Sequence, residues 1–423
     1  MSESPADENS SKQPAGFSLR GTFSALRSRV QKELDPTASL EPAAQPGPIP
    51  GKETKIALTP VRSMAGGEVP SSVKLKRALV IGGMDFFGAA LVRRLNAGGF
   101  RQITVVDSLE DDRWRNFASL GFEELQGFSE FEKLLLSRAR PVGVYSHIFY
   151  LADWRCADSP LALPKAALAL AAESNSRFIS LASASSLGPG PSREDIARGW
   201  PDRFRPECRS GLVACLFDRF AMARLPAKNY LGLKHYRLFG SHERPDGALY
   251  GLAKVVYDHL MNGTVARLPE ALKPGSPEGD RRHDFLSVAY AAEMAAFLAE
   301  QENAAGLYEI GSGVASTPWE LIQAVFAAVN RPPEVEWTQL AFAPPSPEPE
   351  VADLSRLREL GWNKSIPALG DAVAQYVSAC FHHTEELPVT ERAPEAEAEK
   401  QAASGIAKTI PTKRKPFVGK TAT

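Results

Sequence analysis

An apolar run, a glycine-rich turn and a helical pattern follow one another near residue 80, and this succession constrains the fold more than any other feature. The run 78–81 leads into Gly82-Gly-Met-Asp-Phe-Phe-Gly88, and Asp107 ends the next apolar run, 19 residues after Gly88. Glycines let a backbone approach a pyrophosphate, a helix start offers free N–H groups, and such an acid takes ribose hydroxyls. The predicted dinucleotide site comprises Gly82, Gly83, Asp85, Phe86, Phe87, Gly88 and Asp107.

Short apolar runs alternate with helical patterns through the following hundred residues. The runs are 78–81, 103–107, 147–151 and 178–182, and the helical patterns between them are 87–95, 131–139 and 161–172. This alternation is typical of βαβ units and a parallel sheet. We therefore expect an α/β fold with a doubly wound parallel sheet of the Rossmann type, in which Gly98 and Gly99 end the first helix.

Asp85 stands where the glycine pattern has its middle glycine. A carboxylate roughly 4 Å from a phosphate charge costs about 4 kcal/mol at an effective dielectric constant near 20. The cost is smaller if the side chain points away from the phosphates. The loop predicts NAD or NADP as the cofactor, while a Rossmann fold that binds no cofactor stays an open alternative.

The two ends of the chain differ in composition from its centre. Residues 1–74 are rich in Ser, Pro, Ala, Gly and charge, and residues 382–423 are rich in charge. Such segments bury too little apolar surface to offset the entropy of ordering, so we expect a disordered leader and a disordered tail. Within the leader, residues 17–32 have the spacing of a short basic amphipathic helix, which would dock on a partner or lie on an anionic membrane surface; a transient helix in a solvated tail is the alternative. We expect the two ends to tether the chain to protein partners.

Charge and cysteine content exclude several classes of protein. The 49 basic and 50 acidic residues give a net charge of -1, so a general nucleic-acid binder is not expected. The four cysteines lack the spacing of a metal site, and we expect no metal. No apolar run approaches the roughly 18 residues of a membrane span, and the N-terminus has no signal-peptide pattern. These features favour the cytoplasm.

Six motifs in order carry a resemblance to a known family. They are Val105–Leu109, Phe178–Gly188, Lys234–Gly240, Arg282–Val288, Gly306–Gly313 and Asp353–Trp362. Over about residues 77–381 the chain resembles the NAD-dependent epimerase/dehydratase family of extended short-chain dehydrogenases/reductases, and is most similar to its ADP-glycero-manno-heptose 6-epimerases. The resemblance implies a Rossmann domain over 75–240 and a smaller C-terminal substrate lobe over 241–381 that partly returns to the Rossmann sheet. It also implies a nucleotide-sugar ligand and a homodimer.

The resemblance implies catalytic positions that this chain does not fill. Family members use a tyrosine as base, a lysine one helical turn later that lowers the tyrosine pKa, and a Ser or Thr that binds the sugar oxygen. Ser183 falls on the last position, but Ser210 replaces the tyrosine and Ala214 the lysine. A serine hydroxyl is far too weak an acid for this role. Among the substrate-binding positions, Arg237 replaces an asparagine, and His283, beside Arg282, replaces the diphosphate-binding arginine.

Two Tyr-x-x-x-Lys pairs occur elsewhere. Tyr230 and Lys234 lie in a predicted strand, where four residues separate side chains by about 13 Å, too far to act as a pair. Tyr250 and Lys254 lie in a predicted helix over 248–261 and would share a face, as a substitute pair. Asp218 falls in the former catalytic helix, where we expect a solvated or ion-paired face.

Three functions follow from these residues. The first is a non-catalytic scaffold or regulatory subunit that keeps the epimerase fold and binds NAD(P) or a nucleotide sugar. The second is a divergent NAD(P)-dependent nucleotide-sugar epimerase or reductase that uses Ser183 with Tyr250 or Tyr236. The third is an RNA-associated member of the same fold.

Overall fold

The structure is a computed structural model that describes residues 76–108, 112–137, 144–152, 160–188, 195, 203–243, 251–342 and 351–381. The expected leader with its helix at 17–32, the expected tail over 382–423, and Tyr250 all lie outside the described residues.

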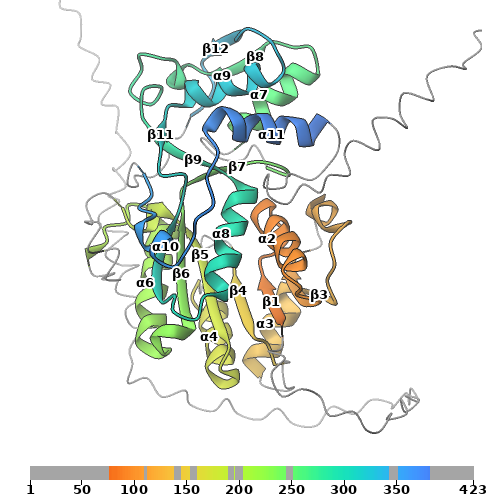
Figure 1. The fold of residues 1–423 in the computed structure, drawn as a ribbon, viewed down its shortest axis with the longest axis vertical. Coiled ribbons are helices and arrows are strands. Elements are labelled where there is room, and N and C mark those ends of the chain that lie inside the picture. Colours follow the sequence, from red (N-terminus) through yellow and green to blue (C-terminus); the bar gives the residue numbers. More distant parts are fainter. Residues whose placement is uncertain are drawn as a thin grey trace, which may run out of the picture.

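A seven-stranded parallel sheet forms the larger body, as the alternating pattern predicts (Figure 1). Its order is β10-β6-β5-β4-β1-β2-β3. The strand order reverses beside β1, which pairs with β2 on one side and with β4 on the other. In such sheets ligands bind at the carboxyl ends of the strands where the order reverses. The strands are β1 (Arg77–Ile81), β2 (Gln102–Asp107), β3 (Glu124–Gly127), β4 (His147–Tyr150), β5 (Arg177–Ser183), β6 (Tyr230–His235) and β10 (Gly306–Ile310).

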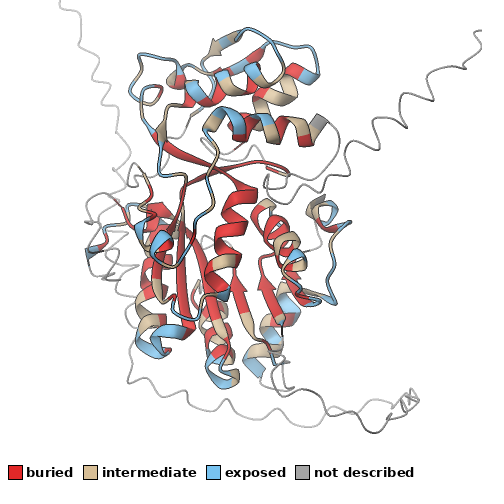
Figure 2. Cartoon of the chain, in the orientation of Figure 1, coloured by how far each residue is buried: buried red, intermediate tan, exposed pale blue. Residues whose placement is uncertain are grey.

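Helices cover both faces of this sheet (Figure 1). On one face α2 (Phe86–Ala97) packs against α8 (Val288–Glu300). On the other, α4 (Ala162–Ser174) contacts both α3 (Phe128–Ser137) and α6 (Arg209–Arg224). The strands other than the edge strand β3 are almost wholly buried between these layers, while the outer helix faces are exposed (Figure 2). The main apolar core therefore lies on the two faces of the sheet.

The smaller body has a core of its own. Its helices are α7 (Leu252–Met261), α9 (Pro318–Ala328) and α11 (Leu369–Phe381), beside the two-stranded sheet of β8 (Ala266–Pro269) and β12 (Val335–Thr338). Helix α9 contacts both α7 and α11, and Thr317 and Glu320 form a capping box at its start. A three-stranded sheet of β7 (Arg237–Phe239), β9 (His283–Ser287) and β11 (Ala315–Ser316) joins the bodies, and α10 (Ser355–Glu359) lies near the large sheet (Figure 1).

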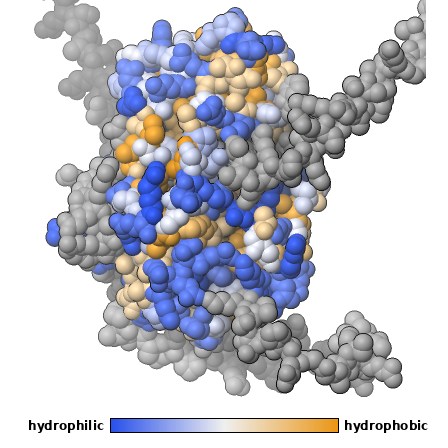
Figure 3. All heavy atoms as spheres, viewed as in Figure 1, coloured by the Kyte–Doolittle hydropathy of each residue, from blue (hydrophilic) through white to orange (hydrophobic). Residues whose placement is uncertain are grey.

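The surface is mostly polar. Apolar patches interrupt it on the smaller body and near the junction of the bodies (Figure 3). The large apolar side chains that are exposed come from separate elements, for example Trp114 and Val314. None of the helices within the described ranges is long and apolar enough to cross a membrane.

Candidate functional site

Two glycines of the turn after β1 are required by close packing. Gly82 has a φ of +79°, and a Cβ there would lie 2.4 Å from the backbone nitrogen of Ala152, after β4. A Cβ on Gly88 would lie 2.0 Å from the carbonyl oxygen of Gly83. The first glycine therefore fits the turn against β4, and the second fits α2 against the turn.

Asp85 occupies the start of α2. Its backbone is extended, with φ -74° and ψ 167°, and its carboxylate Oδ1 accepts a hydrogen bond from the N–H of Phe86 at 2.8 Å. The residue is exposed, whereas Phe86 is half-buried and Phe87 is buried against the core. A negative charge therefore lies at the helix end that attracts anions.

Asp107 lies at the carboxyl end of β2 and is fully buried. Its Oδ2 accepts from the N–H of Met84 at 2.6 Å, and its Oδ1 accepts from the N–H of Ser108 at 2.7 Å. The guanidinium of Arg113, in the 3-10 helix η1 (Asp112–Phe117), lies 3.3 Å from Oδ1. The chain's own groups thus bind the carboxylate that the motif assigns to a ribose.

The positions matched to the catalytic residues meet where β5 faces the first turn of α6. Ser183 ends β5, and its hydroxyl accepts from the N–H of Ser185 at 3.2 Å. Cys208 caps α6: its sulfur accepts from the N–H of Gly211 at 3.3 Å and lies 3.5 Å from Ser210 Oγ and 3.7 Å from Ser185 Oγ. One turn on, Ala214 is buried. This junction therefore carries hydroxyls, a thiol and a methyl group where the family has a phenol and an ammonium.

A buried charge network lies further along the same helix. Asp218 accepts from Lys234 Nζ at 2.6 Å and from the Tyr230 hydroxyl at 2.7 Å, and that hydroxyl lies 2.8 Å from Ser180 Oγ. Both side chains of the ion pair are almost completely inaccessible. Burial, and then the Asp218 charge, raise the pKa of the Tyr230 phenol well above its usual value.

This network corrects two expectations. Asp218 lies on an ion-paired face, as one alternative held, but the face is buried against β6 rather than solvated. Tyr230 and Lys234 do lie in a strand, yet they are joined, because residues i and i+4 of a strand share a face and both side chains reach one carboxylate. Their full burial keeps them away from any substrate.

Arg237 and His283 come together between the two bodies. Strands β7 and β9 pair with Arg237 opposite Phe285, so that His283 lies on the same face. Both side chains are buried. Burial, and then the charges of Arg237 and Arg281, lower the pKa of His283 to about 3. The imidazole is therefore neutral at neutral pH and supplies no charge for a diphosphate. Arg282 points to the opposite face, is exposed, and donates to the carbonyl of Ala315.

Two buried acids at this junction lie within the family motifs but were not predicted as site residues. Asp284 accepts hydrogen bonds from the backbone N–H groups of Ser312, Gly313 and Ala352. Glu309 accepts from the Tyr236 hydroxyl at 2.7 Å and from the N–H of Asp353. Tyr236, which one hypothesis pairs with Ser183, is thus committed to Glu309 and is buried. The sequence signal that could have indicated the burial of the two acids is an acidic residue inside an apolar run.

The substitute pair on α7 is only half described. Helix α7 begins at Leu252, after Gly251 with a φ of +77°, and not at the predicted residue 248. Lys254 binds Asp258 on the same helix, with Nζ–Oδ distances of 2.5 and 2.7 Å. Tyr250 lies outside the described residues.

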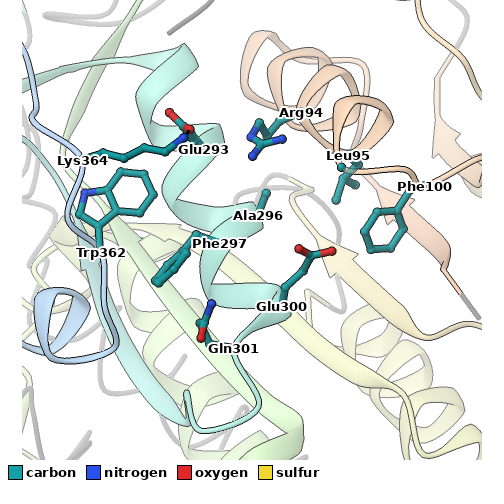
Figure 4. A pocket seen from close by; sticks show the side chains of 11 residues that line it. Arg94, Leu95, Phe100, Glu293, Ala296, Phe297, Glu300, Gln301, Trp362 and Lys364 are labelled. Carbon is teal, nitrogen blue, oxygen red and sulfur yellow. Dashed lines mark ion pairs between the residues drawn. The ribbon is translucent and has the colours of Figure 1, made fainter. Parts of the chain in front are cut away.

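A cavity of about 110 Å³ lies between α2, α8 and the segment before α11 (Figure 4). It contains none of the site residues predicted from the sequence. Two acids of α8 line it: Lys364 forms an ion pair with Glu293, and Lys76 binds Glu300 at 2.7 Å. Lysines of this chain therefore already neutralise the cavity's two acids. Among the described residues no group of three His, Cys, Asp or Glu side chains is placed to hold a metal ion.

Comparisons with known proteins agree with this geometry, although no family model matches the chain. The ADP-L-glycero-D-manno-heptose-6-epimerase of Nitratidesulfovibrio vulgaris (strain DP4) is 26% identical over 322 residues, which cover 71% of this chain and 96% of that protein. Two solved structures share the fold. UDP-N-acetylglucosamine 4-epimerase from Methanobrevibacter ruminantium M1 has a TM-score of 0.57 at 17% identity, covering 74% of this chain and 100% of its own. The UDP-glucose 4-epimerase of Thermus thermophilus, in complex with NAD, has a TM-score of 0.55 at 20% identity. The match covers 71% of this chain and 98% of that one.

The sequence relative and the structural neighbours point to the same group of proteins, and the seven-stranded parallel sheet agrees with them. The resemblance predicted from the sequence motifs is thereby confirmed. The chain is an epimerase/dehydratase-like protein with the NAD-type Rossmann fold of the extended short-chain dehydrogenases/reductases.

Proposed function

We propose that this chain is a non-catalytic epimerase-like protein that acts as a scaffold or regulatory subunit. One observation carries the proposal: near the end of β5, the first two turns of α6 present Ser210 and the buried methyl group of Ala214. Hydride transfer from a sugar carbon needs a group that accepts and returns the hydroxyl proton near neutral pH. Neither side chain does this, because a serine hydroxyl is too weakly acidic and alanine has no proton to exchange.

Two phenols close to the large sheet support the proposal. Tyr230 and Tyr236 each donate to a buried carboxylate, and the pKa of Tyr230 is raised by its surroundings. A base for this chemistry needs a lowered phenol pKa and access to the sugar. Both tyrosines are buried, and Tyr230 has the opposite shift.

The residues at the junction of the bodies support a nucleotide sugar as the ligand of this non-catalytic protein. Relatives and neighbours are named for their action on ADP- and UDP-sugars. Arg237 contributes a cation there, and its charge helps keep His283 neutral. Binding without turnover is a suitable property for a regulatory subunit, whose protein partners would engage the segments 1–74 and 382–423.

A turnover assay tests the proposal. Full-length protein is incubated with ADP- and UDP-sugars together with NAD(H) or NADP(H), and the appearance of an epimerised, dehydrated or oxidised sugar is followed by NMR in parallel with the absorbance of the reduced cofactor. We expect no conversion above the rate without protein. Conversion that disappears in Ser183→Ala would show that the chain is an enzyme.

The catalytic alternative depends on Tyr250, since Tyr236 is committed to Glu309. If turnover is found, Tyr250→Phe identifies this route. Activity lost in that variant and kept in Tyr236→Phe would replace our proposal with a relocated tyrosine base.

A further inference from the structure

We propose that Asp85 sets the affinity of the start of α2 for dinucleotides and sets it low. This inference goes beyond the proposed function and does not depend on it, because it concerns cofactor binding and not proton transfer. Helix α2 has 12 residues, and its first N–H groups are the ones that attract a pyrophosphate. The carboxylate of Asp85 already binds one of them, the N–H of Phe86.

The fold does not require an aspartate at this position. The backbone of residue 85 is extended, a region open to every residue type, and the side chain is exposed. Gly82 and Gly88 differ in this respect, because a Cβ on either would overlap backbone atoms of the chain. Residues 82 and 88 are therefore fixed by packing, whereas the backbone at residue 85 accepts other residue types.

The negative charge of Asp85 disfavours the binding of phosphates at the start of α2. A pyrophosphate that bound these N–H groups would lie beside the Asp85 carboxylate and would displace it from Phe86. For charges about 4 Å apart, an effective dielectric constant near 20 gives a loss of roughly 1000-fold in affinity. Asp85 is exposed, so water and salt screen the repulsion, and we expect at least about a tenfold effect.

A second group, the guanidinium of Arg113, competes with a ribose for the carboxylate of Asp107. Asp107 is fully buried, accepts two backbone N–H groups, and pairs with Arg113. A ribose that bound Asp107 would have to move the guanidinium of Arg113, whose side chain is only 24% exposed. The same guanidinium suits a 2′-phosphate. Arg113 therefore disfavours NAD(H) more than NADP(H).

Direct titration tests both residues. NADH and NADPH are titrated into the full-length protein and into Asp85→Gly and Asp85→Asn, and dissociation constants are measured by calorimetry at fixed ionic strength. We expect Asp85→Gly to bind NADH at least about tenfold more tightly than wild type, and Asp85→Asn to fall between them, because it removes the charge but keeps the side chain. Glycine is tolerated at a helix N-cap, so the fold is kept.

Controls separate charge at this site from charge in general. Glu336→Gln removes an exposed carboxylate of the smaller body and should leave both affinities unchanged. Arg113→Ala should strengthen NADH binding and weaken NADPH binding. Equal affinities of wild type and a folded Asp85→Gly, at any level and including no detectable binding by either, would overturn the proposal. Parallel changes for both dinucleotides in Arg113→Ala would overturn the role of Arg113.

Discussion

The two ends of helix α6 differ in the chemistry they carry. Its first turn presents Cys208 and Ser210, which are half-buried and bonded only to neutral groups in the contacts described above. Its interior presents Asp218, which is buried and holds Lys234 and Tyr230 of β6. The helix thus has a buried ion pair where it binds the sheet, and at its start it has neither the phenol nor the ammonium that hydride chemistry uses in the family. Changes at the catalytic positions and retention of the fold are therefore separable along a single helix.

The largest effect is expected from breaking the interior ion pair. Lys234→Met leaves Asp218 buried without its cation, which should lower the free energy of unfolding by about 3–5 kcal/mol. Urea unfolding measures the change. Arg267→Ala, which removes an exposed pair with Glu336, should cost less than about 1 kcal/mol. If Lys234→Met loses as little free energy of unfolding as this control, the interior of α6 does not bind the sheet through its ion pair, and the contrast between the two ends of the helix is wrong.

A smaller effect is expected from the phenol of the same network. Tyr230→Phe removes a hydrogen bond to a buried carboxylate and should cost about 1.5–3 kcal/mol, measured by the same unfolding experiment. Tyr145→Phe is a matched control, since that buried hydroxyl makes a 3.4 Å contact with the neutral Thr104. If both variants lose the same free energy of unfolding, the charge of Asp218 does not strengthen its hydrogen bond with Tyr230.

The pH dependence of stability extends the comparison to the junction between the bodies. His283 has a folded pKa of about 3, below the unfolded value of 6.5, so stability is fully present above pH 6.5 and is lost as the pH falls toward 3. One such group contributes a slope of up to about 1.4 kcal/mol per pH unit. His283→Gln should flatten the unfolding free energy measured between about pH 6.5 and 4.5. An unchanged slope would mean that His283 is protonated in the folded protein.

The smallest effect is expected at the first turn of α6. Ser210→Ala should change the free energy of unfolding by less than about 0.5 kcal/mol and should leave ligand binding as in wild type. A clear loss of a measured turnover in this variant would assign Ser210 a chemical role that its neutral surroundings do not suggest.

The local elements were predictable, and the buried polar contacts were not. Strands β1, β2, β4 and β5 and the turn after β1 follow from apolar runs and glycine positions, which are local signals. The burial of Asp218 depends on Lys234, 16 residues away, and that of Asp284 on Ser312 and Ala352, 28 and 68 residues away. Periodicity does not report such pairings. The start of α7 was missed because Gly251 adopts a positive φ that ends the helical pattern there.

The place of β10 in the large sheet bears on how the protein is made. β10 pairs with β6, yet it follows β6 by some seventy residues that include α7 and β8 of the smaller body and α8 of the larger one. During synthesis the first six strands emerge while the edge of β6 still has its backbone N–H and C=O groups open. Open strand edges are sites of aggregation, so nascent or truncated chains that stop before residue 306 are the forms most in need of a chaperone.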